Sequence, residues 1–295
     1  MHKVFNNKFV IFSLVLPGMI LFLFAILAPL LLSFYYGMTE WSGIGKPNFI
    51  MFQNYKHIFT DDPAFWRALL NALVLGIALI VIQHPICMFF AILLDKMNSK
   101  TEKFFRAIFF VPCIISVVVT SKMWVNILSY NYGLLNKFLD ATGMGILKQD
   151  WLGDPRTALG SIVFIIMWQG FGWALLIYYA GLKGIPEELF ESARIEGAAG
   201  VKMHSKITIP VLMPVIRINV TLAIISALKQ METVFLTTNG GPGDRTQFIA
   251  NYLYNKAFSS FEYGYGNAIS VIFVLFCLLI TFITDKTLKK DVGEY

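Results

Sequence analysis

The sequence contains few charged residues. Only 14% of its 295 residues are charged, whereas an average soluble protein has about 25%. Hydrophobic residues make up 57%, Phe alone occupies 27 positions, and the mean hydropathy is +0.65. This composition excludes a disordered chain and the two soluble domains that the length alone would suggest. It predicts an integral membrane protein that is embedded in lipid.

Cysteine is scarce as well. Cys87, Cys113 and Cys277 lie inside apolar stretches, with neither disulfide nor metal-ligand spacing. This pattern excludes a small secreted disulfide scaffold, and we expect all three to be small buried hydrophobic residues. The net charge is +6, but the basic residues sit in short segments between apolar runs instead of on one folded face. We therefore predict no metal site, no catalytic residue and no nucleic-acid partner.

Long uncharged runs are what the sequence has in abundance. A hydrocarbon core of about 30 Å needs about 20 mostly apolar helical residues. The first run is too long for a signal peptide and has no cleavage site before Tyr35, so we expect it to be a retained helix. The sequence predicts one transmembrane domain over 1–295, with spans at about 9–36, 68–94, 104–130, 157–182, 207–228 and 267–284.

The positions of Lys and Arg predict how the spans are oriented, because short cytoplasmic loops carry an excess of both. The other side has longer loops, with more acidic residues and with Trp41, Trp66 and Trp151. We therefore expect a multi-pass protein of the cell membrane with both termini in the cytoplasm. The cations assigned to the cytoplasmic side are Lys3, Lys8, Lys96, Lys100, Lys103, Arg106, Lys183, Arg194, Lys202, Lys206, Lys286, Lys289 and Lys290.

The cytoplasmic loop 184–206 is patterned enough to fold. Pro186 at a first helical position, with Glu187 and Glu188 after it, is typical of a helix start, and Gly197 of a helix end. We expect a short helix along the membrane surface with one apolar face of increasingly small residues. The residues that form this face at four-residue spacing are Ile185, Leu189, Ala193 and Gly197.

The same loop carries a recognisable motif. Glu191-Ser192-Ala193, then Gly197 and Ile207-Thr208-Ile209-Pro210 resemble the EAA motif of ABC importer permeases, with Ser and Ile in place of one Ala and one Leu. The resemblance implies a coupling helix that docks on a cytoplasmic ATPase, and the alternative is an ordinary interfacial helix. The residues implied in coupling are Glu188, Glu191, Ser192, Ala193, Gly197, Ile207 and Pro210.

Further segments resemble the carbohydrate-type (MalF-like), binding-protein-dependent permeases over about Phe9–Lys286. These are Asn54-Tyr55, Asp62-Pro63, Phe65–Leu69 with Asn71, Phe105–Pro112, Tyr132–Asn136, and Gly240–Gly243 with Thr246. The resemblance implies an all-α type I ABC importer permease fold of six transmembrane helices plus the coupling helix. It also implies a second homologous permease, two ATPase subunits and an extracellular solute-binding protein as partners, beside membrane lipid.

A phosphate loop is absent from the sequence. The nearest fragment, Gly43–Pro47, lacks the spacing and the hydroxyl of that motif, and we expect it to be a turn. The chain therefore needs no cofactor of its own, and ATP and Mg²⁺ would be used by the partner ATPase subunits.

Polar and aromatic side chains at membrane depth are candidates for a substrate pathway. Aromatic faces bind the apolar faces of sugar rings, and amides bond to hydroxyls; the alternative at Trp168–Trp173 is close helix packing. Ser226 and Gln230 are four residues apart and would share a helix face. The predicted pathway residues are Trp168, Gln169, Gly170, Trp173, Ser226 and Gln230.

Other polar residues receive weaker interpretations. We expect Lys122 to reach water from the outer end of its span, while a cavity-lining amine is the alternative. Lys229 and Glu232 would pair at the interface, and His84-Pro85 would kink its span. The glycine-rich turn at Gly240, Gly241 and Pro242 is a candidate contact of the binding protein.

The sequence therefore predicts the permease subunit of an ATP-driven importer that moves a sugar or oligosaccharide by alternating access. A non-sugar or phosphorylated solute such as glycerol-3-phosphate is the alternative, although buried cations are few. An intramembrane enzyme would need paired acids inside the spans, and a secondary transporter would need an ion-coupling carboxylate there; the sequence has neither.

Overall fold

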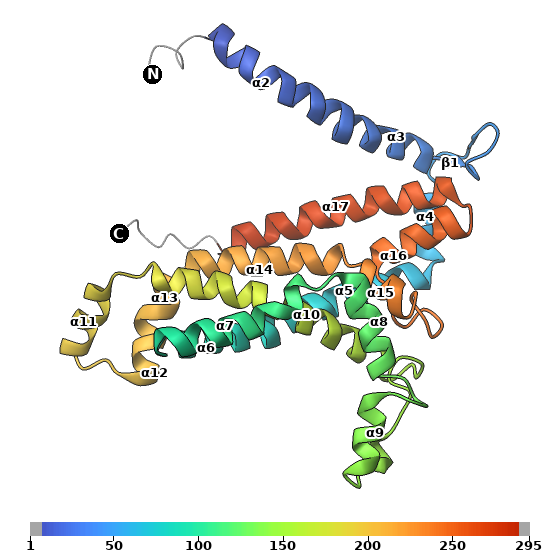
Figure 1. Cartoon of the computed structure of the whole chain (residues 1–295). Coiled ribbons are helices and arrows are strands. Elements are labelled where there is room, and N and C mark those ends of the chain that lie inside the picture. Colours follow the sequence, from blue (N-terminus) through green and yellow to red (C-terminus); the bar gives the residue numbers. More distant parts are fainter. Residues whose placement is uncertain (1–7, 289–295) are drawn as a thin grey trace. The chain divides into compact units, whose positions relative to one another are not determined.

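The computed structural model describes residues 8–288 (Figure 1). Lys3, Lys289 and Lys290, which were assigned to the cytoplasmic side, lie outside the described residues. The chain forms two compact units, each described here by itself. One unit contains the chain up to Asp62 together with Leu253–Phe276, and the other contains Pro63–Tyr252 together with the chain from Cys277.

Four helices of the described chain are long and apolar enough to cross a membrane. They are Phe9–Gly37, Pro63–Asp95, Ala158–Lys183 and Tyr263–Thr284. Two further predicted spans are bent instead of continuous. α7 (Ser99–Ile114) and α8 (Val117–Ile127) meet at 94°, while Gly200–Val211 meets α14 (Met213–Leu228) at 71°. The first of these bends follows Pro112 directly, in the last turn of α7.

Proline also explains three of the π-helical turns. η1 (Leu23–Leu27), η2 (Leu79–Gln83) and η4 (His204–Thr208) each stand directly before a helix with proline at its first or second position. These helices are α3 (Ala28–Gly37), α6 (His84–Asp95) and α13 (Ile209–Val211). A proline ring clashes with the carbonyl four residues earlier, and widening that turn to π geometry relieves the clash. The predicted kink at His84-Pro85 is thus a π-helical turn that ends beside it.

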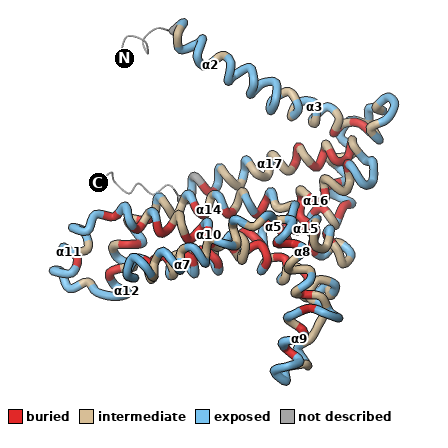
Figure 2. The backbone as a smooth tube through the Cα atoms, in the orientation of Figure 1, coloured by how far each residue is buried: buried red, intermediate tan, exposed pale blue. Residues whose placement is uncertain are grey.

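The larger unit has its best-buried core between α6 and α10 (Ala158–Lys183). Cys87, Leu175 and Tyr178 are almost fully buried there, together with Leu212 at the start of α14. Cys113 and Cys277 are only partly buried, so the expectation that all three cysteines are buried is wrong for these two; they lie on faces that other helices cover incompletely. Buried residues gather along α10, whereas α9 (Leu134–Ala141) and α11 (Glu187–Ile195) are largely exposed (Figure 2).

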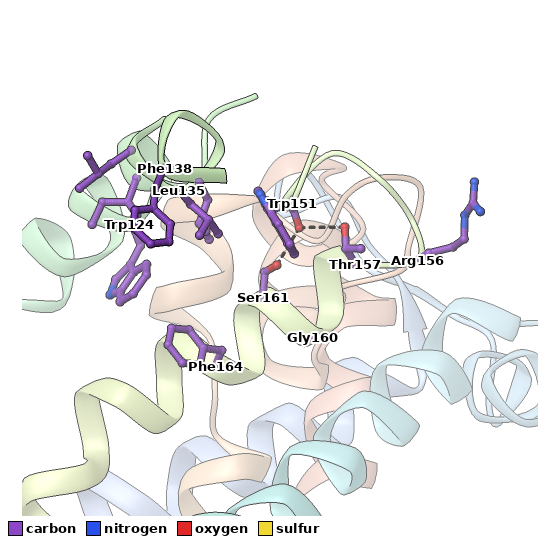
Figure 3. Close-up of a pocket in the computed structure, with 12 residues that line it drawn as sticks. Trp124, Leu135, Phe138, Trp151, Arg156, Thr157, Gly160, Ser161 and Phe164 are labelled. Atoms are coloured by element: carbon purple, nitrogen blue, oxygen red, sulfur yellow. Dashed lines mark hydrogen bonds between the residues drawn. The ribbon is translucent and has the colours of Figure 1, made fainter. Parts of the chain in front are cut away.

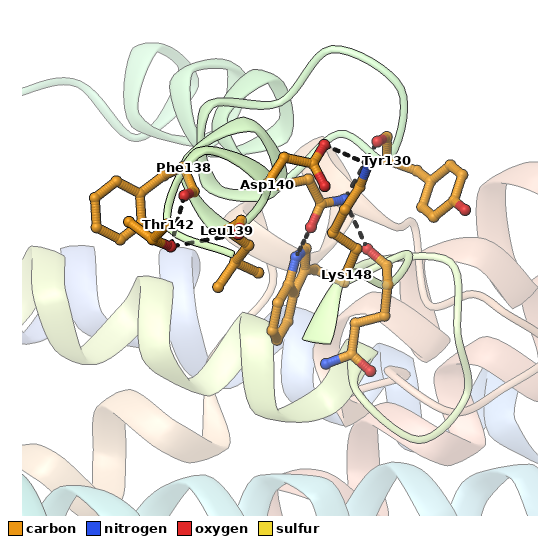
Figure 4. Close-up of polar contacts among 9 residues, drawn as sticks. Tyr130, Phe138, Leu139, Asp140, Thr142 and Lys148 are labelled. Atoms are coloured by element: carbon orange, nitrogen blue, oxygen red, sulfur yellow. Dashed lines mark hydrogen bonds and ion pairs between the residues drawn. The ribbon is translucent and has the colours of Figure 1, made fainter. Parts of the chain in front are cut away.

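A small helical arm follows α8. It contains α9 and the 3-10 turn η3 (Gly145–Leu147), and Lys148 closes it through an ion pair of 2.7 Å with Asp140 (Figure 4). The hydrogen bond to Asp140 raises the pKa of Lys148. Asn136 donates to the carbonyls of Tyr130 and Gln149 and accepts from the indole N–H of Trp151. The Asn136 amide therefore links three separate positions of the arm.

The smaller unit contains α2 (Lys8–Phe22), η1, α3, α4 (Gln53–Thr60), η5 (Asn255–Ser259) and the start of α17 (Tyr263–Leu288). A two-stranded antiparallel ribbon, β1 (Thr39–Glu40) and β2 (Asn48–Phe49), joins α3 to α4. Gly43 and Gly45 have φ of +88° and +76° in its turn, so Gly43–Pro47 is a turn as predicted. The larger unit also contains α5 (Pro63–Ala78), α12 (Gly200–Met203) and α15 (Glu232–Thr237), and α16 (Ile249–Tyr254) includes the boundary between the units.

Gly172 sets how closely α7 approaches α10. A Cβ at this position would overlap the carbonyl oxygen of Phe109 and would lie 2.8 Å from the Cα of Phe110. We expect Gly172→Ala to lower the stability of the purified protein by about 1–3 kcal/mol, because backbone atoms must shift. Gly160→Ala in the same helix is the matched control, since nothing lies within 4 Å of its Cβ position. Equal thermal unfolding midpoints for both variants would contradict the assignment.

Candidate functional site

The loop predicted to form a short surface helix does so as α11. Pro186 was predicted to be the first residue of this helix, and this is wrong. Pro186 is the N-cap residue, with ψ of 133°, and helical geometry begins only at Glu187. At the other end the N–H of Gly197 donates to the carbonyl of Arg194, and that of Ala198 donates to Ala193. With Gly197 at φ +79°, these bonds form a Schellman motif, which lets the chain reverse sharply toward α12 (Gly200–Met203).

The coupling-motif side chains differ in exposure. Glu188, Glu191 and Ser192 are exposed, while Ala193 is buried, since α11 contacts α12 and η4. The predicted continuous apolar face is wrong in part. Ile185 and Ala193 are buried, but Leu189 and Gly197 are exposed, because the helix turns only one side to its neighbours. Ile207 lies half-buried in η4 and Pro210 lies exposed in α13.

Polar contacts tie this loop to the ends of two long helices. The Nζ of Lys183, the last residue of α10, lies 2.7 Å from a carboxylate oxygen of Asp95, the last residue of α6. The next residue, Lys96, places its Nζ 3.3 Å from Nε2 of His204, whose Nδ1 lies 3.1 Å from the hydroxyl of Thr208. The loop therefore contacts the end of α6 through side chains, beside its backbone connection to α10.

A cavity of about 410 Å³ lies among η2, α6, α7, α10 and α14. Its polar lining includes three almost fully buried side chains, Gln83, His84 and Asn219. The complete lining is Leu79, Gln83, His84, Cys113, Ile166, Gln169, Gly170, Trp173, Ala174, Asn219, Leu222, Ala223 and Ser226.

The amides of this cavity bond to backbone carbonyls. Gln169 donates to the carbonyl of Ile115 at 3.1 Å, at the bend between α7 and α8. Gln83 donates to Met167 at 2.8 Å, and His84 Nδ1 lies 2.8 Å from the hydroxyl of Tyr178. Gln169 therefore lines the cavity and also links α10 to the bend between α7 and α8.

The structure brings four of the six predicted pathway residues to this cavity: Gln169, Gly170, Trp173 and Ser226. Trp168 faces the other way, with its ring 5.4 Å from that of Trp124, and lines a neighbouring pocket of about 360 Å³. Gln230 does not share the helix face of Ser226, because α14 ends at Leu228. Lys122 is exposed on α8.

Gln83 and Asn219 were missed from the sequence, and His84 was interpreted only as part of a kink. The available signal was their polarity inside apolar runs, since buried amides within spans are rare. Their convergence depends on contacts between separate helices, which no local pattern specifies.

The glycine-rich turn is closed by its own contacts. Thr246, which is fully buried, donates to the carbonyl of Gly241 at 2.6 Å, and its N–H donates to Gly240. Gly240 is buried with φ of +92°, while Gly241 and Pro242 are half-buried. Asn71 of α5 donates to the carbonyls of Arg245 and Gln247 and fixes the turn to that helix.

A much larger cavity, of about 800 Å³, lies between α8, α9 and the start of α10 (Figure 3). Trp124, Phe138 and Phe164 dominate its lining, and Arg156 lies at its edge. Within residues 8–288, no group of three or more His, Cys, Asp or Glu side chains is arranged to hold a metal ion.

The comparison with known families decides the class of this protein. Residues 85–288 match the family described as "Binding-protein-dependent transport system inner membrane component". The chain belongs to this family. It is therefore a multi-pass membrane component of an ABC transporter and not an enzyme.

Individual relatives match almost the whole permease. The probable ABC transporter permease protein YurN of Bacillus subtilis is 31% identical over 291 residues, covering 98% of this chain and 99% of YurN. The multiple sugar-binding transport system permease protein MsmF of Streptococcus mutans is 32% identical over 292 residues, covering 98% and 97%. A crystallised bacterial ABC transporter involved in alginate import gives a TM-score of 0.82 at 22% identity over 99% of both chains. This likeness confirms the predicted fold class.

The bond between Gln169 and Ile115 gives a testable prediction for the permease. We expect Gln169→Met to reduce the free energy of unfolding by about 1–3 kcal/mol, because the carbonyl of Ile115 loses its amide donor. Thermal unfolding in nanodiscs measures the effect. Gln230→Met, beyond the end of α14, is the control. A midpoint for Gln169→Met that equals the control would show that the bond contributes nothing.

Proposed function

We propose that this permease imports a sugar or oligosaccharide by alternating access, powered by ATP hydrolysis in two cytoplasmic ATPase subunits that use Mg²⁺. The observation that carries the proposal is the α11 loop, which ends in a Schellman motif, exposes Glu188 and Glu191 and contacts α6 through Lys96 and His204. Closure of the ATPases would push this loop and rock the helices around the cavity. The loop and both termini would then lie in the cytoplasm.

The chemistry of the cavity supports a neutral, hydroxylated substrate. Gln83, Gln169 and Asn219 offer amides, Trp173 offers an aromatic face, and no Lys or Arg is among the residues that line it. A phosphorylated solute such as glycerol-3-phosphate would need cations there. A hydroxylated substrate agrees with the names of several relatives, which are permeases of sugar, starch-product and diacetylchitobiose systems.

A second homologous permease would form the other half of the pathway, and an extracellular binding protein would deliver the substrate. The alginate transporter was crystallised with a pentasaccharide-bound periplasmic protein, which supports this partner. Gly240, Gly241 and Pro242 are at least half-buried. The proposed contact surface for the binding protein therefore also includes the exposed neighbours Gly243 and Arg245.

Charge reversal on α11 tests the coupling. We expect Glu191→Lys to reduce sugar uptake at least tenfold and to uncouple or release the ATPase subunits, because the exposed carboxylate would face a basic groove. Co-purification and ATP-driven uptake in proteoliposomes measure both effects. Glu196→Lys is the control, with the same charge change just beyond the helix. Unchanged uptake and co-purification for Glu191→Lys would overturn the coupling assignment.

The cavity gives a second test. We expect Trp173→Ala and Ser226→Val to lower uptake of a radiolabelled neutral oligosaccharide about tenfold, at unchanged membrane abundance, because each residue lines the cavity. Competition by unlabelled glycerol-3-phosphate identifies the alternative substrate class. Trp168→Phe, on the opposite side of the helix, is the control. If glycerol-3-phosphate competes and neutral sugars do not, the sugar assignment is wrong.

A further inference from the structure

The smaller unit contains a polar cleft that no part of the transport pathway described above uses. It has a volume of about 610 Å³ and lies between the β1–β2 ribbon, α4 and the segment that leads into α17. Under the proposed orientation this cleft opens on the extracytoplasmic face. Its lining is Glu40, Trp41, Ser42, Ile44, Lys46, Asn48, Asn54, His57, Phe261, Glu262 and Tyr265.

The walls of the cleft are held by backbone contacts. The N–H of Gly264 donates to the carbonyl of Trp41 at 3.0 Å, and a Cβ at Gly264 would overlap the carbonyl oxygen of Thr39. The side-chain amide of Asn54 donates to the carbonyls of Gly37 and Thr39, both at 2.9 Å. The chain's own backbone and side-chain contacts therefore fix the ribbon against the start of α17 and form the cleft.

Two aromatic side chains are positioned at the cleft. Trp41 stacks on Tyr36 with ring centroids 4.7 Å apart, and its indole N–H donates to the carbonyl of Gly45. Phe261 is 59% exposed and has a φ of +59°. A positive φ is energetically costly for a bulky residue. Because the Phe261 ring is exposed, its burial does not offset this cost. An aromatic ring held open to solvent in this way suits a ligand with an apolar face.

Polar groups with planar geometry surround these rings. Glu40 and Asn48 are direct neighbours across the ribbon and are both exposed. His57 lies on the ring of Tyr265, with centroids 5.4 Å apart, and Tyr265 donates to Asp62 beneath it. Carboxylate, amide and imidazole groups bond to adjacent hydroxyls, while aromatic rings cover C–H faces.

The charges in the cleft nearly cancel. Glu262 forms an ion pair of 3.2 Å with Lys256, which leaves Glu40 and Lys46 as opposite charges on the ribbon. A site for an acidic sugar or a phosphate would need an excess of cations. The 800 Å³ cavity of the α9 arm, with its aromatic and aliphatic lining, lacks this mixture of groups.

We propose that this cleft is an outer carbohydrate subsite, which holds one neutral sugar ring of the substrate as it passes from the binding protein into the permease. The inference rests on the proposed sugar import. It assigns Glu40, Trp41, Asn48 and Phe261 a role in substrate hand-over, separate from the cavity lined by Gln169.

The test uses the assembled importer in proteoliposomes, with the neutral oligosaccharide that the wild type takes up. We expect the double variant Glu40→Gln with Asn48→Ala to lower the maximal uptake rate about tenfold at saturating loaded binding protein. The KM for the loaded binding protein should not change. Lys56→Gln, exposed on α4 outside the cleft, is the control.

Two results would overturn the subsite. The first is an unchanged maximal rate of the double variant; if the KM is raised at the same time, the surface binds the delivery protein and not the sugar. The second is a diazirine derivative of the same oligosaccharide that fails to label residues 40–48 or 261–265 in the wild type. Failure of the proposed function gives a different result, because the wild type itself would then take up no neutral sugar.

Discussion

The whole structure depends on how backbone carbonyls are satisfied where helices break inside a membrane. Lipid offers no hydrogen-bond donors, so a carbonyl that loses its helical partner needs a donor from the protein. Gln169 supplies one at the bend between α7 and α8. Gln83 and Asn219 donate to carbonyls of α10, at 2.8 and 3.5 Å. The same side chains line the 410 Å³ cavity, so the amides that bond to a bend and to a neighbouring continuous helix also make its wall polar.

Asparagine side chains satisfy backbone carbonyls in several loops as well. Asn54, Asn71 and Asn136 each donate to two carbonyls that lie far from them in sequence or across a turn. All three belong to the segments that resemble carbohydrate-type permeases. Their positions are explained by loop geometry and need no contact with a substrate. A family resemblance carried by such residues therefore identifies the fold more directly than the ligand.

Some of this structure could be predicted from the sequence. Length and apolarity located four helices that are long and apolar enough to cross a membrane, and Gly197 marked the end of α11, because both signals are local. The bends at Ile115 and Leu212 were missed because each apolar run continues through its bend, although Pro112 and Pro210 were local signals for them. The error at Gln230 has the same origin: a helix face was extended beyond Leu228, where the helix ends. The convergence of Gln83, Gln169 and Asn219 needs three helices in register, and no single segment encodes that.

The π-helical turn at Leu79–Gln83 has a consequence for how the second span meets its neighbours. A π turn accommodates one extra residue, which rotates the following helix face by about 100°. The two halves of Pro63–Asp95 accordingly pack on different partners: α5 lies mainly against α14, whereas α6 lies mainly against α10. The second span therefore presents one helix face to α14 before the π turn and a different face to α10 after it. A helical wheel drawn through residue 79 would assign half of its side chains to the wrong neighbour.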